Sequence, residues 1–442
     1  MAEELAAWMA ERRAAHLWVV YTDFHGRMAG RDVPQSRVAS VSEGGTNFAK
    51  ANFNFTIRDQ QLQNPSFGAD SGDVLAIPDA ESVVLLPFQP DSALAFATLH
   101  DESGLVWEGC PRGALKRAVG ALAEAGLKAS VAFEPEFYLF SAESGEPISD
   151  GGMYTIDGLN DGMSFVRRLA EVLPAMGVQL EQIGKEYGHG QYEGNIAPDR
   201  PLQAAEDMFL LRLAVRGVAR ELGQHASFMP KIAPDAAGSG LHIHLSLQDA
   251  ESEDDRTADG SHPSGLSQFA RSFMAGWLKH AEALTALGAP TPNSYKRLQP
   301  ASWAPAHICW GIGNRAAMVR VPGPGKRARL EFRAGDNTSN PFLYLAGLIW
   351  AGLDGARNEL DPGEPTSADV GHLDATQIAQ QGVRFLPRDA GTAFDAFERD
   401  EVLRDGLGEL IHRNFLRVKR TELAAYNLVV TDWERAAYFD AP

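Results

Sequence analysis

The sequence contains only two cysteines, Cys110 and Cys309, among its 442 residues. Two thiols cannot build a disulfide framework or a cysteine-rich zinc site. Basic residues are also in deficit, because 40 lysines and arginines stand against 58 acids and give a formal net charge of −18. This balance argues against a general nucleic-acid-binding surface and says little about chemistry.

Long apolar runs are missing as well, since no segment approaches the roughly 20 apolar residues of a membrane helix. Residues 1–16 form an amphipathic pattern with acids first, which is the reverse of a signal peptide. Neither a P-loop (GxxxxGK[ST]) nor a GxGxxG turn after a strand is found. We therefore expect a cytoplasmic globular protein with no membrane partner and no nucleic-acid partner.

The length predicts two or three folding units. Residues 1–105 are typical of a small mixed α/β domain, with a first helix, strand patterns at 17–23, 82–87 and 92–106, and a long irregular loop over 38–72. From Pro111 onward, polar-bearing strands alternate with apolar-striped helices. The helices are expected after Pro111 and at 162–176, 202–222, 265–287, 341–353 and 419–438, and an acidic solvated loop is expected at 248–265.

The segment 131–140 (VAFEPEFYLF) is strongly apolar but carries Glu134 and Glu136 at a spacing of two. Residues i and i+2 of a strand share one face, so both carboxylates point into the same space. Close carboxylates in an apolar wall repel each other and lose hydration, which a divalent cation would relieve. The spacing alone also allows a strand edge with two solvated acids.

A second segment, 185–198 (KEYGHGQYEGNIAP), places Glu186 before a glycine-rich turn. After the turn, Gln191, Glu193 and Asn195 share one face of a predicted strand. Taken alone, two acids around a glycine-rich turn are better explained by coincidence than by a binding site.

The third segment, 238–247 (GSGLHIHLSL), predicts an apolar strand with His242, His244 and Ser246 on one face. A neutral imidazole is a common ligand of divalent metals, although a single strand histidine is more often a core residue. Two histidines in register after a Gly-Ser-Gly turn favour a site.

The fourth segment, 314–336, holds the densest basic cluster of an acidic chain. Arg327, Arg329, Glu331 and Arg333 fall on one face of a predicted strand. The planar guanidinium binds carboxylates and phosphates bidentately. A nucleic-acid patch or a solvated strand is the alternative, but the interleaved glutamate favours a pocket.

In this order, the four segments resemble the glutamine synthetase family, as do 293–298 (NSYKRL), the NPF of 340–342 and the GDV…PD of 72–79. The resemblance covers about residues 17–355. It implies an α+β fold with a small N-terminal β-grasp-like domain (residues 1–105). A large C-terminal catalytic domain (residues 106–442) would follow, with an antiparallel sheet funnel and flanking helices. It also implies a dodecamer of two stacked hexameric rings with active sites between subunits.

The resemblance also implies roles for individual residues. Two divalent cations, Mg²⁺ or Mn²⁺, would be held by Glu136, Glu186 and Glu193 and by Glu134, His242 and Glu331. Glutamate would be held by Arg297, Arg333 and Gly238. The nucleotide would be held by Ser246, His244 and Arg329, and the phosphates of ATP and the transferred phosphoryl group by Arg315 and Arg320. The implied reaction is phosphorylation of the γ-carboxylate of glutamate by ATP, then attack of an amine.

Three departures from the family pattern bear on the amine. Trp303 stands where the family has an acidic flap residue. No acid occurs in 47–52, where an ammonium-binding aspartate is expected and Ala49 is the match. Ala237 replaces an asparagine before Gly-Ser-Gly. Recognition of ammonium needs such charges, whereas an apolar amine needs surface to bury.

The sequence thus predicts an ATP-dependent ligase that joins glutamate to an organic amine other than ammonia, with Trp303 contacting the amine. Trp303 could instead pack on the protein. A true ammonia-using enzyme is the near alternative. The alternative from another class is a catalytically silent homologue that binds nucleotide or metabolite in a regulatory role.

Overall fold

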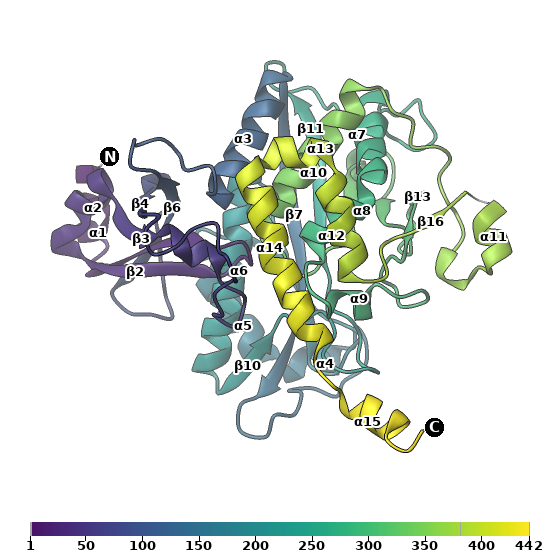
Figure 1. Cartoon of the computed structure of the whole chain (residues 1–442), viewed down its shortest axis with the longest axis horizontal. Helices are drawn as coiled ribbons and strands as arrows, with labels where there is room; N and C mark the ends of the chain where they lie inside the picture. The colour runs from purple at the N-terminus through teal and green to yellow at the C-terminus, as the bar shows by residue number, and fades with distance from the viewer. Residues whose placement is uncertain (1, 381, 442) are drawn as a thin grey trace.

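The computed structural model describes residues 2–380 and 382–441 (Figure 1). The N-terminal part is a six-stranded sheet in the order β2-β1-β6-β4-β3, with β5 beside β6. Strands β1 and β6 run parallel and the other pairs are antiparallel. Its elements are α1 (Ala2–Glu11), β1 (His16–Thr22), β2 (Met28–Pro34), α2 (Val38–Gly44), β3 (Thr46–Ala49), β4 (Asp73–Pro78), β5 (Val84–Leu85) and β6 (Ser92–His100).

The long loop predicted over residues 38–72 is wrong in its first half. This stretch contains α2, β3 and a 3₁₀ helix at Lys50–Asn54. Val38, Phe48 and Phe53 are buried and fix these short elements to the core. These three apolar residues are too far apart in the sequence to show the spacing typical of a helix or a strand, which explains the error.

The larger part of the chain is built on an eight-stranded mixed sheet in the order β13-β14-β15-β11-β7-β9-β8, with β10 also paired to β7. Its strands are β7 (Leu127–Ser141), β8 (Leu180–Lys185), β9 (Gln191–Ile196), β10 (Gln224–Ser227), β11 (Leu241–Asp249), β13 (Trp310–Ile312), β14 (Val319–Val321) and β15 (Leu330–Phe332). A separate pair joins β12 (His307–Ile308) to β16 (Arg384–Phe385).

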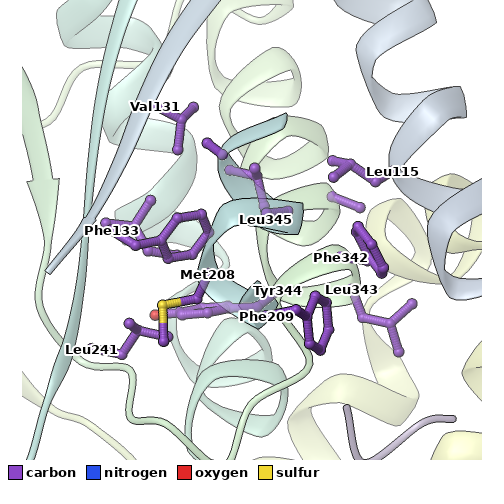
Figure 2. Packing of buried hydrophobic residues seen from close by; sticks show 14 of the residues in the cluster. Leu115, Val131, Phe133, Met208, Phe209, Leu241, Phe342, Leu343, Tyr344 and Leu345 are labelled. Atoms are coloured by element: carbon purple, nitrogen blue, oxygen red, sulfur yellow. The ribbon is translucent and has the colours of Figure 1, made fainter. Parts of the chain in front are cut away.

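The remaining elements of this part of the chain are helices, most of which contribute buried residues to the core, whereas the last of them contributes none. They are α3 (Pro111–Glu124), α4 (Ile156–Asp161), α5 (Met163–Ala175), α6 (Pro201–Glu221), α7 (Gln268–Lys279), α8 (Ala281–Gly288), α9 (Ser294–Arg297), α10 (Pro341–Arg357), α11 (Ala375–Gln380), α12 (Ala390–Arg399), α13 (Glu401–Leu407), α14 (Glu409–Asn427) and α15 (Asp432–Tyr438). Figure 2 shows Phe133 of β7 above Met208 of α6, with Phe209 and Phe342 packed together. Burial of these side chains stabilises the fold by roughly 1.5–3 kcal/mol each.

Along the central strand β7, successive side chains point alternately into the core and toward the opposite face of the sheet. Val131, Phe133 and Phe137 are buried, whereas Glu134 and Glu136 alternate with them and point to the opposite face. The strand pairs with β11 and, nearer its C-terminal end, with β10 on one side, and with β9 on the other. This register carries its two glutamates into the middle of the sheet.

Several predicted elements have different limits. The helix expected at 265–287 is two helices, α7 and α8, divided at His280, whose ring hydrogen-bonds Asp354 and Asp400. The helix expected at 419–438 begins earlier, as α14, and a second helix, α15, follows the N-cap Thr431, which forms a capping box with Glu434. The basic strand extends only over β15, because Arg327 ends a 3₁₀ helix at Gly325–Arg327.

The mixed α/β architecture agrees with the predicted fold class. The β-grasp assignment of the N-terminal sheet and the division between residues 105 and 106 stay predictions. In the acidic segment 248–265, Gln248 and Asp249 belong to β11, and the rest forms turns and bends. Within residues 2–380 and 382–441, no helix combines the length and the apolar character that a membrane span requires.

Candidate active site

Strand pairing brings five of the six predicted metal ligands into one row across the large sheet, and the sixth, Glu186, follows directly after β8. Glu134 of β7 lies opposite His242 of β11, and Glu136 lies opposite Glu193 of β9. On the other side of β11, His244 lies opposite Glu331 of β15. Cross-strand neighbours have Cβ atoms about 4.5–5.5 Å apart, so these side chains share one space.

Glu134 is at the centre of this group. Its Oε2 lies 2.8 Å from His244 Nε2 and 3.5 Å from His242 Nδ1, and its Oε1 accepts a hydrogen bond of 2.8 Å from Asn195 Nδ2. Ligand atoms of Glu134, Glu193 and His242 all lie within 4.8 Å of one another. The same holds for Glu134, His244 and Glu331. These groups divide the histidines differently from the predicted ligand sets, so the assignment to individual ions stays a prediction.

The electrostatics of the row favour a bound cation. Burial, with help from neighbouring carboxylates, raises the pKa of Glu193 to about 10. Burial also raises the pKa of Glu136 to about 7, although Gly240 donates its N–H to Oε2 at 3.0 Å. Burial and nearby Arg333 lower the pKa of His242 to about 4, which keeps the imidazole neutral at pH 7. Carboxylates that resist ionisation together with a neutral imidazole fit a hard divalent ion such as Mg²⁺ or Mn²⁺.

Glu331 links the carboxylates to the arginines. It is fully buried and accepts hydrogen bonds from Arg320 Nη1 at 2.6 Å and from Arg333 Nη1. Burial opposes ionisation, but Arg333 and the neighbouring histidines outweigh it and lower the pKa of Glu331 to about 2. An ionised glutamate therefore holds two guanidinium groups in fixed positions before any ligand arrives.

Arg297 occupies a second buried position beside Glu136. Its Nη1 donates to Gly335 O at 3.0 Å and its Nη2 to Arg333 O at 3.2 Å. Gly238 and Gly240 pack on this side chain. A Cβ at the first would lie 2.7 Å from Arg297 Cγ, and a Cβ at the second 2.6 Å from Arg297 Nη2. The Gly-Ser-Gly turn therefore gives the arginine its room.

The residues predicted to bind nucleotide lie further along the same strands. Arg329 Nε donates to His244 Nδ1 at 3.0 Å, and Ser246 lies on β11 opposite Ser130 of β7. Arg315 is exposed, and its carbonyl accepts a 3.1 Å hydrogen bond from Arg333 Nε. These three predicted residues therefore lie along or beside the carboxylate row.

Two residues that the sequence did not single out also support the row. Tyr154 Oη donates to Glu186 Oε1 at 3.0 Å, and burial together with Glu186 raises the pKa of this tyrosine to about 12. Asn337 Nδ2 donates to the carbonyls of Glu136 and Gly240 at 3.0 and 2.9 Å. Tyr154 belongs to a glycine-rich segment without periodicity, and an aromatic residue in such a segment was the only available signal.

Trp303 lies outside the sheet, in the segment between α9 and β12. It has a positive φ of 62°, as does Ala301 with 58°, and its side chain is 75% exposed. Ser302, its neighbour, donates to Arg297 O at 3.1 Å and so attaches the loop to the buried arginine. The exposure argues against packing on the protein as the reason for a tryptophan here.

Ala49, the match to the missing aspartate, ends β3 and lies opposite Asp73 of β4. Asp73 accepts a 3.2 Å hydrogen bond from Asn47 Nδ2. An acid is therefore present beside this position, but on the neighbouring strand.

Comparison with known proteins agrees with this arrangement. The family model described as "Glutamine synthetase, catalytic domain" matches residues 108–438. The chain belongs to the glutamine synthetase family. It is 34% identical to the glutamine synthetase of Pyrococcus abyssi, over 97% of this chain and 98% of the relative. It is equally 34% identical to the glutamate–methylamine ligase of Methyloversatilis universalis, over 99% of both.

Solved structures give the same picture of the fold. A structure described as a GmaS/ADP complex superposes with a TM-score of 0.89 at 30% identity, covering 99% of both chains. A structure described as a novel glutamine synthase homolog superposes with a TM-score of 0.84. The protein is therefore a ligase of the glutamine synthetase family, an ATP-dependent family that uses divalent metals.

Proposed function

We propose that this protein is an ATP-dependent ligase that joins the γ-carboxylate of glutamate to an organic amine other than ammonia. The observation that carries the proposal is an exposed tryptophan, Trp303, on a loop hydrogen-bonded to Arg297 where an acid is expected. Ala49 replaces the second expected acid. The glutamate–methylamine ligase that aligns with 99% of the chain supports the same substrate class.

The proposed roles follow from position and charge. Arg297 and Arg333 would hold the carboxylates of glutamate, with Gly238 offering its backbone at close range. Arg320 and Arg315 would face the phosphates of ATP, where charge develops during phosphoryl transfer. Ser246, His244 and Arg329 would contact the nucleotide.

The carboxylate row would hold two divalent cations, with Glu134, Glu136, Glu186, Glu193, His242 and Glu331 as ligands. Bound there, Mg²⁺ or Mn²⁺ would neutralise phosphate charge and act as Lewis acid. An oxygen of the γ-carboxylate attacks the γ-phosphorus of ATP and ADP leaves. The amine nitrogen then attacks the acyl carbon of γ-glutamyl phosphate, inorganic phosphate leaves and the nitrogen loses a proton.

Trp303 would distinguish amines by surface and not by charge. Its indole offers an apolar wall, or a π face to a cationic amine, worth about 0.5–2 kcal/mol. Its only polar group is a donor, so it cannot accept the proton of the amine. The proton then passes to another group or to solvent, which favours amines that are already partly neutral.

We further propose the dodecamer of two hexameric rings that the family resemblance implies. Helix α15 extends away from the body of the molecule (Figure 1). It and the residues before it expose a run of apolar side chains, namely Leu428, Val429, Val430, Trp433 and Phe439. Such a patch on an isolated chain is typical of a protein–protein interface. Sedimentation of the full chain would test this assembly.

The decisive experiment measures ADP release with glutamate, ATP and a panel of amines that includes ammonium, methylamine and longer primary amines. We expect turnover with at least one organic amine and little with ammonium. Robust glutamine formation from ammonium would contradict the proposal. A chain that binds ATP but releases no ADP with any amine would support the silent homologue, although all six predicted metal ligands are present.

A further inference from the structure

Strand β9 carries an amide on either side of Glu193, and both amides face the glutamates of β7. Gln191, Glu193 and Asn195 share one face of β9 because they are two residues apart. Gln191 Nε2 donates to Glu136 Oε2 at 3.1 Å. Asn195 Nδ2 donates to Glu134 Oε1 at 2.8 Å. The proposed reaction gives neither amide a role, although each one holds a predicted metal ligand.

Gln191 is completely buried, and its hydrogen bonds fix the orientation of its amide. Its Oε1 accepts the N–H of Gly188 at 2.9 Å, so its Nε2 must be the atom that faces Glu136. The same Nε2 donates to Gly238 O at 3.0 Å. One side chain therefore joins a predicted metal ligand to both glycine-rich turns of the site.

Two donors hold the same oxygen of Glu136. Oε2 accepts hydrogen bonds from Gln191 Nε2 and, at 3.0 Å, from the backbone N–H of Gly240. Oε1 accepts no hydrogen bond within the part of the chain that the structure describes. A carboxylate that is held through one oxygen presents the other oxygen to an ion in a fixed direction. We therefore expect Glu136 to bind a cation through Oε1 alone.

Asn195 has the same relation to Glu134. Its side chain makes no other hydrogen bond among the described residues, so its amide contacts only this carboxylate. Oε2 of Glu134 faces the histidines of β11, 2.8 Å from His244 Nε2 and 3.5 Å from His242 Nδ1. A carboxylate oxygen can accept two bonds, so Oε2 can still bind an ion beside His242.

A neutral amide suits this task better than a charged donor. The row already concentrates acids, and a lysine or arginine in either place would orient the carboxylate but would also repel a cation. An amide donates its N–H without adding charge. Loss of a group that holds a metal ligand in this way typically lowers metal affinity by about 10–100-fold.

We propose that Gln191 and Asn195 are positioning residues, and that each sets the affinity of one of the two ions. Gln191 acts on the ion that Glu136 binds, and Asn195 acts on the ion that Glu134 binds. The inference rests on the proposed function for the presence of these ions. A residue that merely stabilised the fold would change both affinities together, so the selectivity of the effect is the property to measure.

The test is titration of the full-length protein with Mn²⁺, without ATP, glutamate or amine, in which electron paramagnetic resonance measures the free ion. We expect the wild-type chain to bind two ions. Asn195→Leu keeps the approximate shape without the donor, and should weaken one ion by about 10–100-fold while the other stays nearly unchanged. Gln191→Met should weaken the other ion by a similar factor, and the double variant should weaken both.

Gln203→Met is the matched control. Gln203 Nε2 donates to Asp207 Oδ1 at 2.8 Å on α6, outside the row, so its loss should leave both affinities as in the wild type. If Gln191→Met fails to fold, Asn195→Leu alone decides.

A crystal structure with Mn²⁺ provides a second measurement. Glu136 should bind the ion through Oε1, while Oε2 keeps its two N–H donors. Binding through Oε2, unchanged affinities in Asn195→Leu, or equal losses at both ions would overturn this proposal and leave the proposed function intact. A wild-type chain that binds no Mn²⁺ would overturn it together with the metal ligands of the proposed function, so the two failures can be told apart.

Discussion

The carboxylate row and the Trp303 loop differ sharply in how firmly the surrounding structure holds their side chains. In the row, Glu331 is completely buried and holds two arginines, and Glu134 and Glu136 alternate with core residues on strand β7. Trp303 lies on an irregular segment with positive φ, and the residue is 75% exposed. The first arrangement fixes geometry before a ligand binds, and the second leaves a side chain free to meet one.

This contrast indicates a division of labour. Phosphoryl transfer needs charges held where negative charge will develop, which favours rigid strands. Choice of amine needs only a surface of suitable size, which a loop can change without disturbing the sheet. Substitutions in the row should therefore change stability or turnover strongly, whereas substitutions in the Trp303 loop should mainly change the affinity for the amine.

The largest effect should come from Glu331→Gln. The substitution leaves two guanidinium groups without their buried carboxylate, and we expect the free energy of unfolding to fall by about 3–5 kcal/mol. Chemical denaturation would measure it. Glu398→Gln is the matched control, because Glu398 pairs with Arg420 at the surface and should cost less than about 1 kcal/mol. If both variants lost the same free energy of unfolding, the carboxylate row would be no more important for stability than a surface ion pair.

Arg320→Gln should reduce turnover by about 10²–10³-fold while nucleotide affinity changes little, because charge develops mainly in the transition state. Steady-state ADP release and equilibrium nucleotide binding would separate the two quantities. Arg329→Gln provides the comparison, since this arginine contacts His244 and should weaken nucleotide binding more than turnover. Similar mild losses in both quantities would assign Arg320 a structural role.

Divalent cations should stabilise the row in a pH-dependent way. The raised pKa values of Glu136 and Glu193 mean that the metal-free protein is stabilised by protons below their ordinary pKa, and loses that stability as pH rises through about 7 and then about 10. Saturating Mn²⁺ replaces those protons and should add about 2.7 kcal/mol at one hundred times its Kd.

Thermal unfolding at about pH 5.5 and about pH 8, with Mn²⁺ or with a chelator at matched ionic strength, tests this expectation. Mn²⁺ should raise Tm more at the higher pH. Glu193→Gln should flatten the pH dependence of the chelated protein. An identical rise in Tm at both pH values would place the ion elsewhere.

Trp303→Ala should have the smallest effect on the protein and a visible one on the amine. Because the side chain is mostly exposed, stability should stay within about 0.5 kcal/mol of wild type. The KM for an organic amine should rise by roughly 2–30-fold, which corresponds to a loss of about 0.5–2 kcal/mol. Trp303→Phe keeps an aromatic face and should retain most of the affinity. Unchanged KM values for every amine would exclude contact with the substrate.

The shared face of the acids on β7 could be predicted because the information for it is local. A spacing of two on a strand is enough to place Glu134 and Glu136 on one face, and the same parity applies to His242 and His244. The pairing of Glu136 with Glu193 depends on strand register, which no single segment specifies. For that step the family resemblance was needed.

Prediction from the sequence fails where a short element has few buried residues, or where a contact joins residues that are far apart in the sequence. Helix α2 depends on one buried valine, Val38, and its period cannot be seen in seven residues. The support that Tyr154 gives to Glu186 joins positions 32 residues apart through a loop.

The close packing of Gly238 and Gly240 on Arg297 has a consequence for sequence divergence. Because even a methyl group at either position would collide with an arginine fixed by two backbone carbonyls, these three positions can change only together. A relative that carries a larger residue at either glycine would therefore need a smaller side chain in place of Arg297, the residue that we propose holds the acid substrate.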